Sequence, residues 1–276
     1  MYQYARPSNQ SSFRSNSPLS NDTIARYAPS VLATEAHESR GDRYAFIPTI
    51  NVIDGLRANG FQPFEVRQTR VRDQNKREHT KHLVRLRHDS HISAAVGQEV
   101  PEIILLNSHD GSSSYQLMSG FFRMVCSNGL IAGDVQNDIR IRHSGNVVDD
   151  VIEGSYRVLD NIEAASQRIE TYKSITLSPG EQSALADAAV QLRWGDSAPI
   201  YGSHQLLRAR RYEDQKNDLW STFNRLQENL VKGGIGGRSK TNRRTTTREV
   251  GGVNENVKLN RALWTLADRM AELKTA

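Results

Sequence analysis

Basic side chains gather in one short stretch of the sequence, residues 67–88. The stretch has eight lysine and arginine residues and two acidic ones, a net charge of +6, whereas the whole chain carries only +5. The basic residues are Arg67, Arg70, Arg72, Lys76, Arg77, Lys81, Arg85 and Arg87. Clustered positive charge is suited to the phosphates of a nucleic acid. Because Arg85 and Arg87 are two residues apart, the spacing predicts a row of phosphate contacts along one face of a β-strand.

A second basic stretch, residues 232–248, has six basic residues and no acid, again +6. These are Lys232, Arg238, Lys240, Arg243, Arg244 and Arg248. Since the total is +5, the rest of the chain is net negative and the positive charge is segregated. Glycines bound residues 232–252 and few apolar residues lie between them, which predicts a mobile basic loop that closes on nucleic acid. A solubilising linker is the alternative.

Aromatic residues near the basic strands are candidates for stacking on bases. Tyr115, Phe121 and Phe122 lie in the apolar runs that follow the first basic stretch, and stacking on aromatic side chains is typical of single-strand binding. Packing in the protein core is the competing interpretation. Cys126 stands among apolar residues, where a free cysteine is usually a small buried side chain.

Histidine and carboxylate residues raise the question of a hydrolytic metal site. The spacing matches no known metal motif, and scattered histidines on a basic sheet more often supply hydrogen bonds. We therefore expect no metal, no cofactor and no catalytic residue, and keep a metal-dependent nuclease as an alternative. Its candidate ligands would be His79, His82, His88, His91, His109, Asp89, Glu102 and Asp110.

The pattern of apolar residues predicts an α+β fold. An N-terminal core of mixed helix and antiparallel sheet should precede a helical C-terminal region. We expect a flexible polar arm at 1–40, the core with its basic hairpin at 41–148, and the helical region at 149–276. Helices are predicted within 44–61, from 149 for about six turns, from the S-x-x-E capping box at Ser178 to about Gln191, and within 218–233 and 254–273. Strands are predicted within 63–73, 81–90, 100–122 and 139–145.

Bulk composition limits the class of protein. A mean hydropathy of −0.61, 24% charged residues and no apolar run near the roughly 18 residues of a membrane span predict a protein outside the membrane. The N-terminus lacks the apolar segment of a secretory signal, and one cysteine allows no intramolecular disulfide. We therefore expect a cytoplasmic location.

Three segments carry a resemblance to a known family: residues 107–115, FFRMVCSNGL with Arg123, Cys126, Asn128 and Gly129, and the closing NRALWTLADRMAEL. The resemblance, from about Tyr44 onward, is to the phage- and plasmid-borne domain-of-unknown-function family 932. It implies a phage, plasmid or prophage context and a bacterial cytoplasm, and it brings no reaction. The order of elements in residues 44–130 is also similar to the core of Rad52-type single-strand annealing proteins, an analogy of fold alone.

The leading hypothesis is a mobile-element protein that binds DNA, with single strands favoured, and holds or anneals it in recombination or replication. An alternative is a host-interaction or counter-defence protein that docks a bacterial protein through its acidic segment 149–190, which has a net charge of −5, or through its helical tail. The sequence leaves strand preference and oligomeric state open, a homo-oligomer included.

Overall fold

The computed structural model describes residues 11–41, 44, 46–71, 73–91, 99–123, 128–131, 139–141 and 147–275. They form two compact units, each built from several separate segments of the chain. Unit 1 takes the described residues within 1–93, 102–117 and 139–156, and unit 2 takes those within 94–101, 118–138 and 157–276. Because the chain passes between the units several times, neither is one continuous segment.

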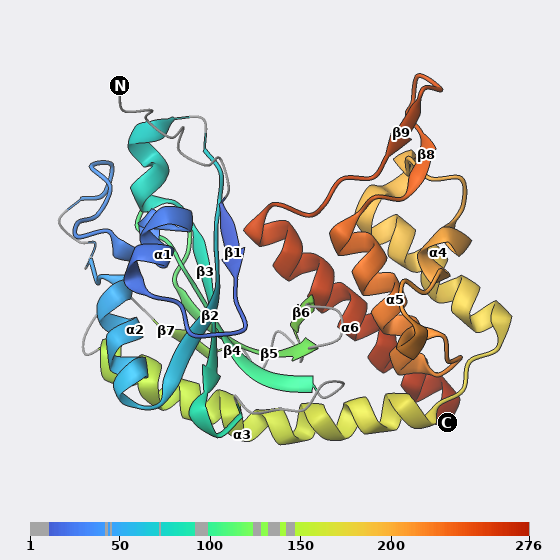
Figure 1. Cartoon of the computed structure of the whole chain (residues 1–276), viewed down its shortest axis with the longest axis horizontal. Helices are drawn as coiled ribbons and strands as arrows, with labels where there is room; N and C mark the ends of the chain where they lie inside the picture. The colour runs from blue at the N-terminus through green and yellow to red at the C-terminus, as the bar shows by residue number, and fades with distance from the viewer. Residues whose placement is uncertain are drawn as a thin grey trace. The chain divides into compact units, whose positions relative to one another are not determined.

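The predicted α+β class is confirmed, with a sheet in the N-terminal half and mainly helices after it (Figure 1). Seven strands in the described part of the chain join in the order β1-β2-β3-β4-β5-β6, and β7 pairs with β5. They are β1 Ser12–Arg14, β2 Phe61–Gln68, β3 His82–His88, β4 Glu99–Asn107, β5 Tyr115–Arg123, β6 Asn128–Ile131 and β7 Ile139–Ile141. The predicted hairpin is antiparallel β2–β3, with Val66 opposite Val84. A 3-10 turn, Gln74–His79, forms its polar tip.

The predicted helices are also present. They are α2 Thr49–Ala58, α3 Val147–Ser174, α4 Pro179–Trp194, α5 Leu219–Lys232 and α6 Val253–Thr275. A further helix that was not predicted, α1 Asn21–Tyr27 with Ile24 buried, lies in the segment expected to be a flexible arm. The capping box at the start of α4 is complete, since Ser178 and Glu181 each bond the other's backbone N–H. Among the helices in the described ranges, none is both long and apolar enough to cross a bilayer.

The core of unit 2 centres on aromatic side chains of α5 and α6. Trp264 packs edge-on to Phe223 at a centroid distance of 6.0 Å, and Phe223 stacks on Trp220 at 5.4 Å. Another face of α5 is polar but also buried, and there Arg225 donates a hydrogen bond to Gln182 Oε1 at 2.9 Å. Since buried polar groups need such partners, α5 is held at a fixed place in unit 2.

The predicted mobile loop after α5 is instead a β-hairpin, β8 Gly236–Arg238 paired with β9 Arg244–Thr246, which extends from the helices of unit 2 (Figure 1). Three buried side chains anchor its base: Ile235, Thr247 and Val250. The Thr247 hydroxyl accepts a hydrogen bond from the Ile235 N–H at 3.0 Å. The prediction that this segment cannot order itself is therefore wrong, because its few apolar residues all lie at the base.

Candidate nucleic-acid interface

Arg85 and Arg87 do not form the predicted exposed basic face. Both are 2% exposed, and both bind the carboxylate of Glu102, Arg85 Nη1 to Oε2 and Arg87 Nε to Oε1, each at 2.9 Å. Arg87 also lies over the Phe64 ring, 4.3 Å from its centroid. The expectation of a solvent-facing phosphate row is wrong here, because the neighbouring strand β4 supplies the counter-charge.

Glu65 of β2 balances the same group of arginines. It is 4% exposed, lies directly opposite Arg85 in the sheet and binds Arg85 Nε at 3.3 Å, Arg67 Nη2 at 3.3 Å and the Arg14 guanidinium. Burial alone would raise the pKa of Glu65, but Arg14, Arg85 and Arg67 outweigh burial and hold the pKa at about 2. Three of the eight cations of the first basic stretch, Arg67, Arg85 and Arg87, are thus neutralised by carboxylates inside unit 1.

The remaining cations of the first stretch differ in exposure. Arg70 and Lys76 are exposed, and Arg70 Nε donates to Ser11 Oγ at 2.9 Å. Arg77 and Lys81 are half-buried, and Arg72 lies outside the described residues.

The predicted stacking residues belong to the core where the structure describes their side chains. Tyr115 is fully buried and donates its hydroxyl to the Ile47 carbonyl at 2.9 Å, and Phe121 is 1% exposed. The prediction that Tyr115 and Phe121 stack on bases is therefore wrong, because no base could reach these buried rings in the folded protein. Phe122 pairs with Gly129, and Arg123 with Asn128, between β5 and β6. The side chains of this pairing and Cys126 lie outside the described residues.

The histidines near the hairpin enter a buried hydrogen-bond network. The two ring nitrogens of His82 bond different hydroxyls: Nδ1 lies 2.9 Å from Ser30 Oγ, and Nε2 lies 2.9 Å from Thr49 Oγ1. The same Thr49 hydroxyl lies 3.2 Å from His109 Nε2. Burial lowers the pKa of His82 to about 4, so its ring is neutral at pH 7. His88 Nδ1 bonds Ser90 Oγ at 2.7 Å.

The three carboxylates considered as ligands of a nuclease metal have other surroundings. Asp110 accepts a hydrogen bond from the Ser112 N–H at 2.9 Å, Glu102 binds arginines and Asp89 is exposed.

The candidate metal ligands do not converge in the ranges that the structure describes. There, no group of three or more His, Cys, Asp or Glu side chains is placed to hold a metal ion. His91 has no described side chain, and His79 is half-buried beside His37, with ring centroids 5.3 Å apart.

The second basic stretch presents its charge to solvent. Its exposed cations are Arg238, Lys240, Arg243, Arg244 and Arg248. Lys232 differs: it is half-buried and binds Glu228 Oε1 at 2.8 Å, a carboxylate that Arg211 also binds at 2.7 Å. The Arg238 guanidinium donates to the Asn242 carbonyl at 3.0 Å, which fixes the turn of the hairpin without burying the charge.

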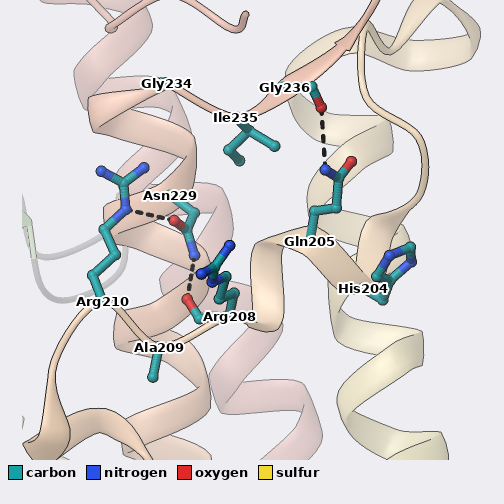
Figure 2. A pocket seen from close by; sticks show the side chains of 9 residues that line it. All are labelled: His204, Gln205, Arg208, Ala209, Arg210, Asn229, Gly234, Ile235 and Gly236. Atoms are coloured by element: carbon teal, nitrogen blue, oxygen red, sulfur yellow. Dashed lines mark hydrogen bonds between the residues drawn. The ribbon is translucent and has the colours of Figure 1, made fainter.

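A pocket of about 710 Å³ lies at the base of this hairpin (Figure 2). Arg208, Arg210 and Asn229 line one part of it, and Gln205 and Ile235 line another. In Figure 2 the Arg208 guanidinium lies between the Asn229 and Gln205 side chains. The pocket and the exposed cations of β8–β9 together make a positively charged surface within unit 2.

Residues 36–264 match the family described as "Domain of unknown function (DUF932)". The chain belongs to this family. It is 49% identical to UPF0380 protein YfjQ and 48% identical to UPF0380 protein YafZ, both of Escherichia coli strain K12, over 93% of this chain and of each relative. No solved structure matches the chain. The expected membership in family 932 is therefore confirmed.

Two exposed arginines of this DUF932 chain, Arg208 and Arg210, lie outside the two basic stretches named from the sequence. The sequence signal for them is a short basic run before α5 that also contains Arg211, which is half-buried and binds Glu228 Oε1 at 2.7 Å. Two tyrosines nearby in the sequence, Tyr201 and Tyr212, are 62% and 83% exposed. Exposed aromatics among cations are the feature that Tyr115 and Phe121 were expected to supply.

Proposed function

We propose that the chain is a nucleic-acid-binding protein that holds the phosphate backbone through the β8–β9 hairpin. The supporting observation is the set of five exposed cations between Arg238 and Arg248, a segment with no acidic residue. Solvent-facing cations neutralise phosphates and release counterions on binding, whereas ion pairs buried with their own carboxylates do not. The hairpin therefore replaces the β2–β3 strands as the proposed contact surface.

Single strands are the favoured form of nucleic acid in this proposal. Tyr201 and Tyr212 expose large aromatic side chains in the segment that leads into α5. Stacking of a base on such a ring is worth about 1–3 kcal/mol and requires bases that are not paired in a duplex. The proposed cellular role is to hold or anneal strands during recombination or replication of a mobile element, without breaking covalent bonds.

The test is the affinity of the protein for single- and double-stranded DNA of about 20 nucleotides at about 50 mM salt, measured by fluorescence anisotropy. We expect binding to both, with the single strand bound more tightly. A variant with four glutamine substitutions in the hairpin, called the four-fold hairpin variant, should lose most of this binding, since about four phosphate contacts disappear. Its substitutions are Arg238→Gln, Lys240→Gln, Arg243→Gln and Arg244→Gln.

A matched variant controls for the change in net charge. It removes four exposed cations elsewhere, through Arg26→Gln, Lys216→Gln, Lys258→Gln and Arg269→Gln. This control should bind DNA nearly as well as the unmodified protein. Absence of binding to either DNA form, or equal losses in the two variants, would refute the proposed role of the hairpin.

A further inference from the structure

The pocket at the hairpin base has a rigid frame. Asn229 of α5 donates to the carbonyls of Leu206 at 2.8 Å and Arg208 at 2.9 Å, and accepts from Arg210 Nε at 2.6 Å. Arg210 also donates to the Gly233 carbonyl. These bonds fix the segment 206–210 against the end of α5, so the pocket has a defined shape before any ligand binds.

Gln205 closes the frame on the other side. Its Nε2 donates to the Gly236 carbonyl at 3.1 Å, and its Oε1 accepts from the Tyr201 N–H at 2.8 Å. Strand β8 is thereby joined to the segment that carries the exposed Tyr201 ring. Both amide side chains of the pocket are engaged in the frame, and the other polar side chains of its lining are Arg208, Arg210 and His204.

Arg208 provides the charge of the pocket. Its side chain is exposed, and no hydrogen bond or ion pair of its guanidinium occurs among the residues that the structure describes. Arg210 uses two of the five N–H donors of its guanidinium in the frame. The described lining contains no carboxylate, while Ala209 and Ile235 add apolar surface. This composition suits an anion with an apolar part and disfavours a cation.

We propose that this pocket binds the phosphate monoester of a nucleotide. A monoester carries a charge of about −1.5 to −2 at pH 7, more than the single charge of a backbone diester, and an arginine fork matches its oxygens. The volume of about 710 Å³ lies within the range of ordinary small-ligand pockets. The monoester could come from the phosphorylated end of a strand held by the hairpin, a form that rests on the proposed function, or from a free nucleotide.

The experiment compares four ligands on the full-length protein. Three ligands share one single-stranded DNA sequence and differ in having a 5′-phosphate, a 3′-phosphate or no terminal phosphate. The fourth is free thymidine 5′-monophosphate. The affinity for each ligand is measured by calorimetric titration. We expect one phosphorylated end to bind about ten-fold more tightly than the unphosphorylated strand, the effect of one charge-assisted contact. Preference for one end also identifies which terminus the pocket takes.

Arg208→Gln is the test variant, and Lys216→Gln is its control. Both remove one exposed positive charge from unit 2, and Lys216 does not line the pocket. Arg208→Gln should abolish the ten-fold preference for a phosphorylated end, whereas Lys216→Gln should leave that preference unchanged. Since the Arg208 guanidinium is exposed, equal thermal unfolding of the variants checks that the fold is intact.

The outcomes separate this inference from the proposed function. Equal affinity for all three oligonucleotides, with no binding of the free nucleotide, overturns the pocket inference while the nucleic-acid proposal stands. Binding of the free nucleotide alone supports the pocket and removes the nucleic-acid proposal. If Arg208→Gln weakens all three oligonucleotides equally, Arg208 is a backbone contact and the monoester site is refuted. Binding of none of the four ligands refutes both.

Discussion

Burial of Arg85 and Arg87 beside Glu102 makes this carboxylate the charge on which the hairpin β2–β3 depends. All three side chains are at most 2% exposed, and Glu102 accepts from both arginines at 2.9 Å. Removing one member of a buried ion pair leaves the partner charge without compensation in a poorly solvated place, which costs about 3–5 kcal/mol.

We expect Glu102→Gln to lower the free energy of unfolding by about 3 kcal/mol, since two buried guanidinium groups lose the negative charge of Glu102. Urea unfolding followed by circular dichroism measures this loss. Glu272→Gln is the control, because its partner Arg269 is exposed and such pairs contribute about 0–1 kcal/mol. A loss for Glu102→Gln as small as that of the control would contradict a buried network in unit 1.

The sequence could predict the alternation of these residues but not their surroundings. A period of two places Arg85 and Arg87 on the same side of β3, as the sequence predicts. Which side is buried depends on contacts with distant residues such as Glu65 and Glu102, whose pairing is set by strand register. A clue was present, since both acids fall in the predicted strands and could have balanced the arginines.

At the scale of elements, the hairpin β8–β9 depends on a close approach of backbones at Gly237. A Cβ atom there would overlap the Pro199 carbonyl oxygen and lie 2.6 Å from Ile200 Cα. Helices and most strands were predictable because their apolar periodicity is local. The hairpin was missed because its order comes from this contact and from the buried Ile235, Thr247 and Val250, which are distant from Pro199 in the sequence.

Gly237→Ala should displace the hairpin, because backbone atoms cannot yield as a flexible side chain would. We expect a loss of about 1–3 kcal/mol in the free energy of unfolding and weaker DNA binding at unchanged net charge. Gly236→Ala is the matched control, since a Cβ at Gly236 meets nothing within 4 Å. Chemical denaturation and anisotropy on both variants test this. Equal behaviour of the two would mean that the packing at Gly237 does not anchor the hairpin.

For the whole molecule, the distribution of charge matters more than its total of +5. Segregation of the charge into two stretches was evident from the sequence, but the stretches differ in what they present to solvent. In the first, Arg67, Arg85 and Arg87 are paired with carboxylates within unit 1, whereas the second keeps five exposed cations on and just after the β8–β9 hairpin. Long-range attraction for a polyanion should therefore come mainly from the second stretch.

The salt dependence of binding measures this division of charge directly. Each phosphate contact on a single strand contributes a slope of about −0.7 to log K against log salt, so five contacts give about −3.5. The four-fold hairpin variant should retain a slope of only about −0.7, because a single hairpin cation remains. Anisotropy titrations between about 50 and 200 mM salt give the slopes, and the four-fold control variant should keep the original one. A hairpin variant that kept the full slope would show that phosphates are bound elsewhere, with Arg70 and Lys76 of unit 1 as the first cations to substitute, since both are exposed.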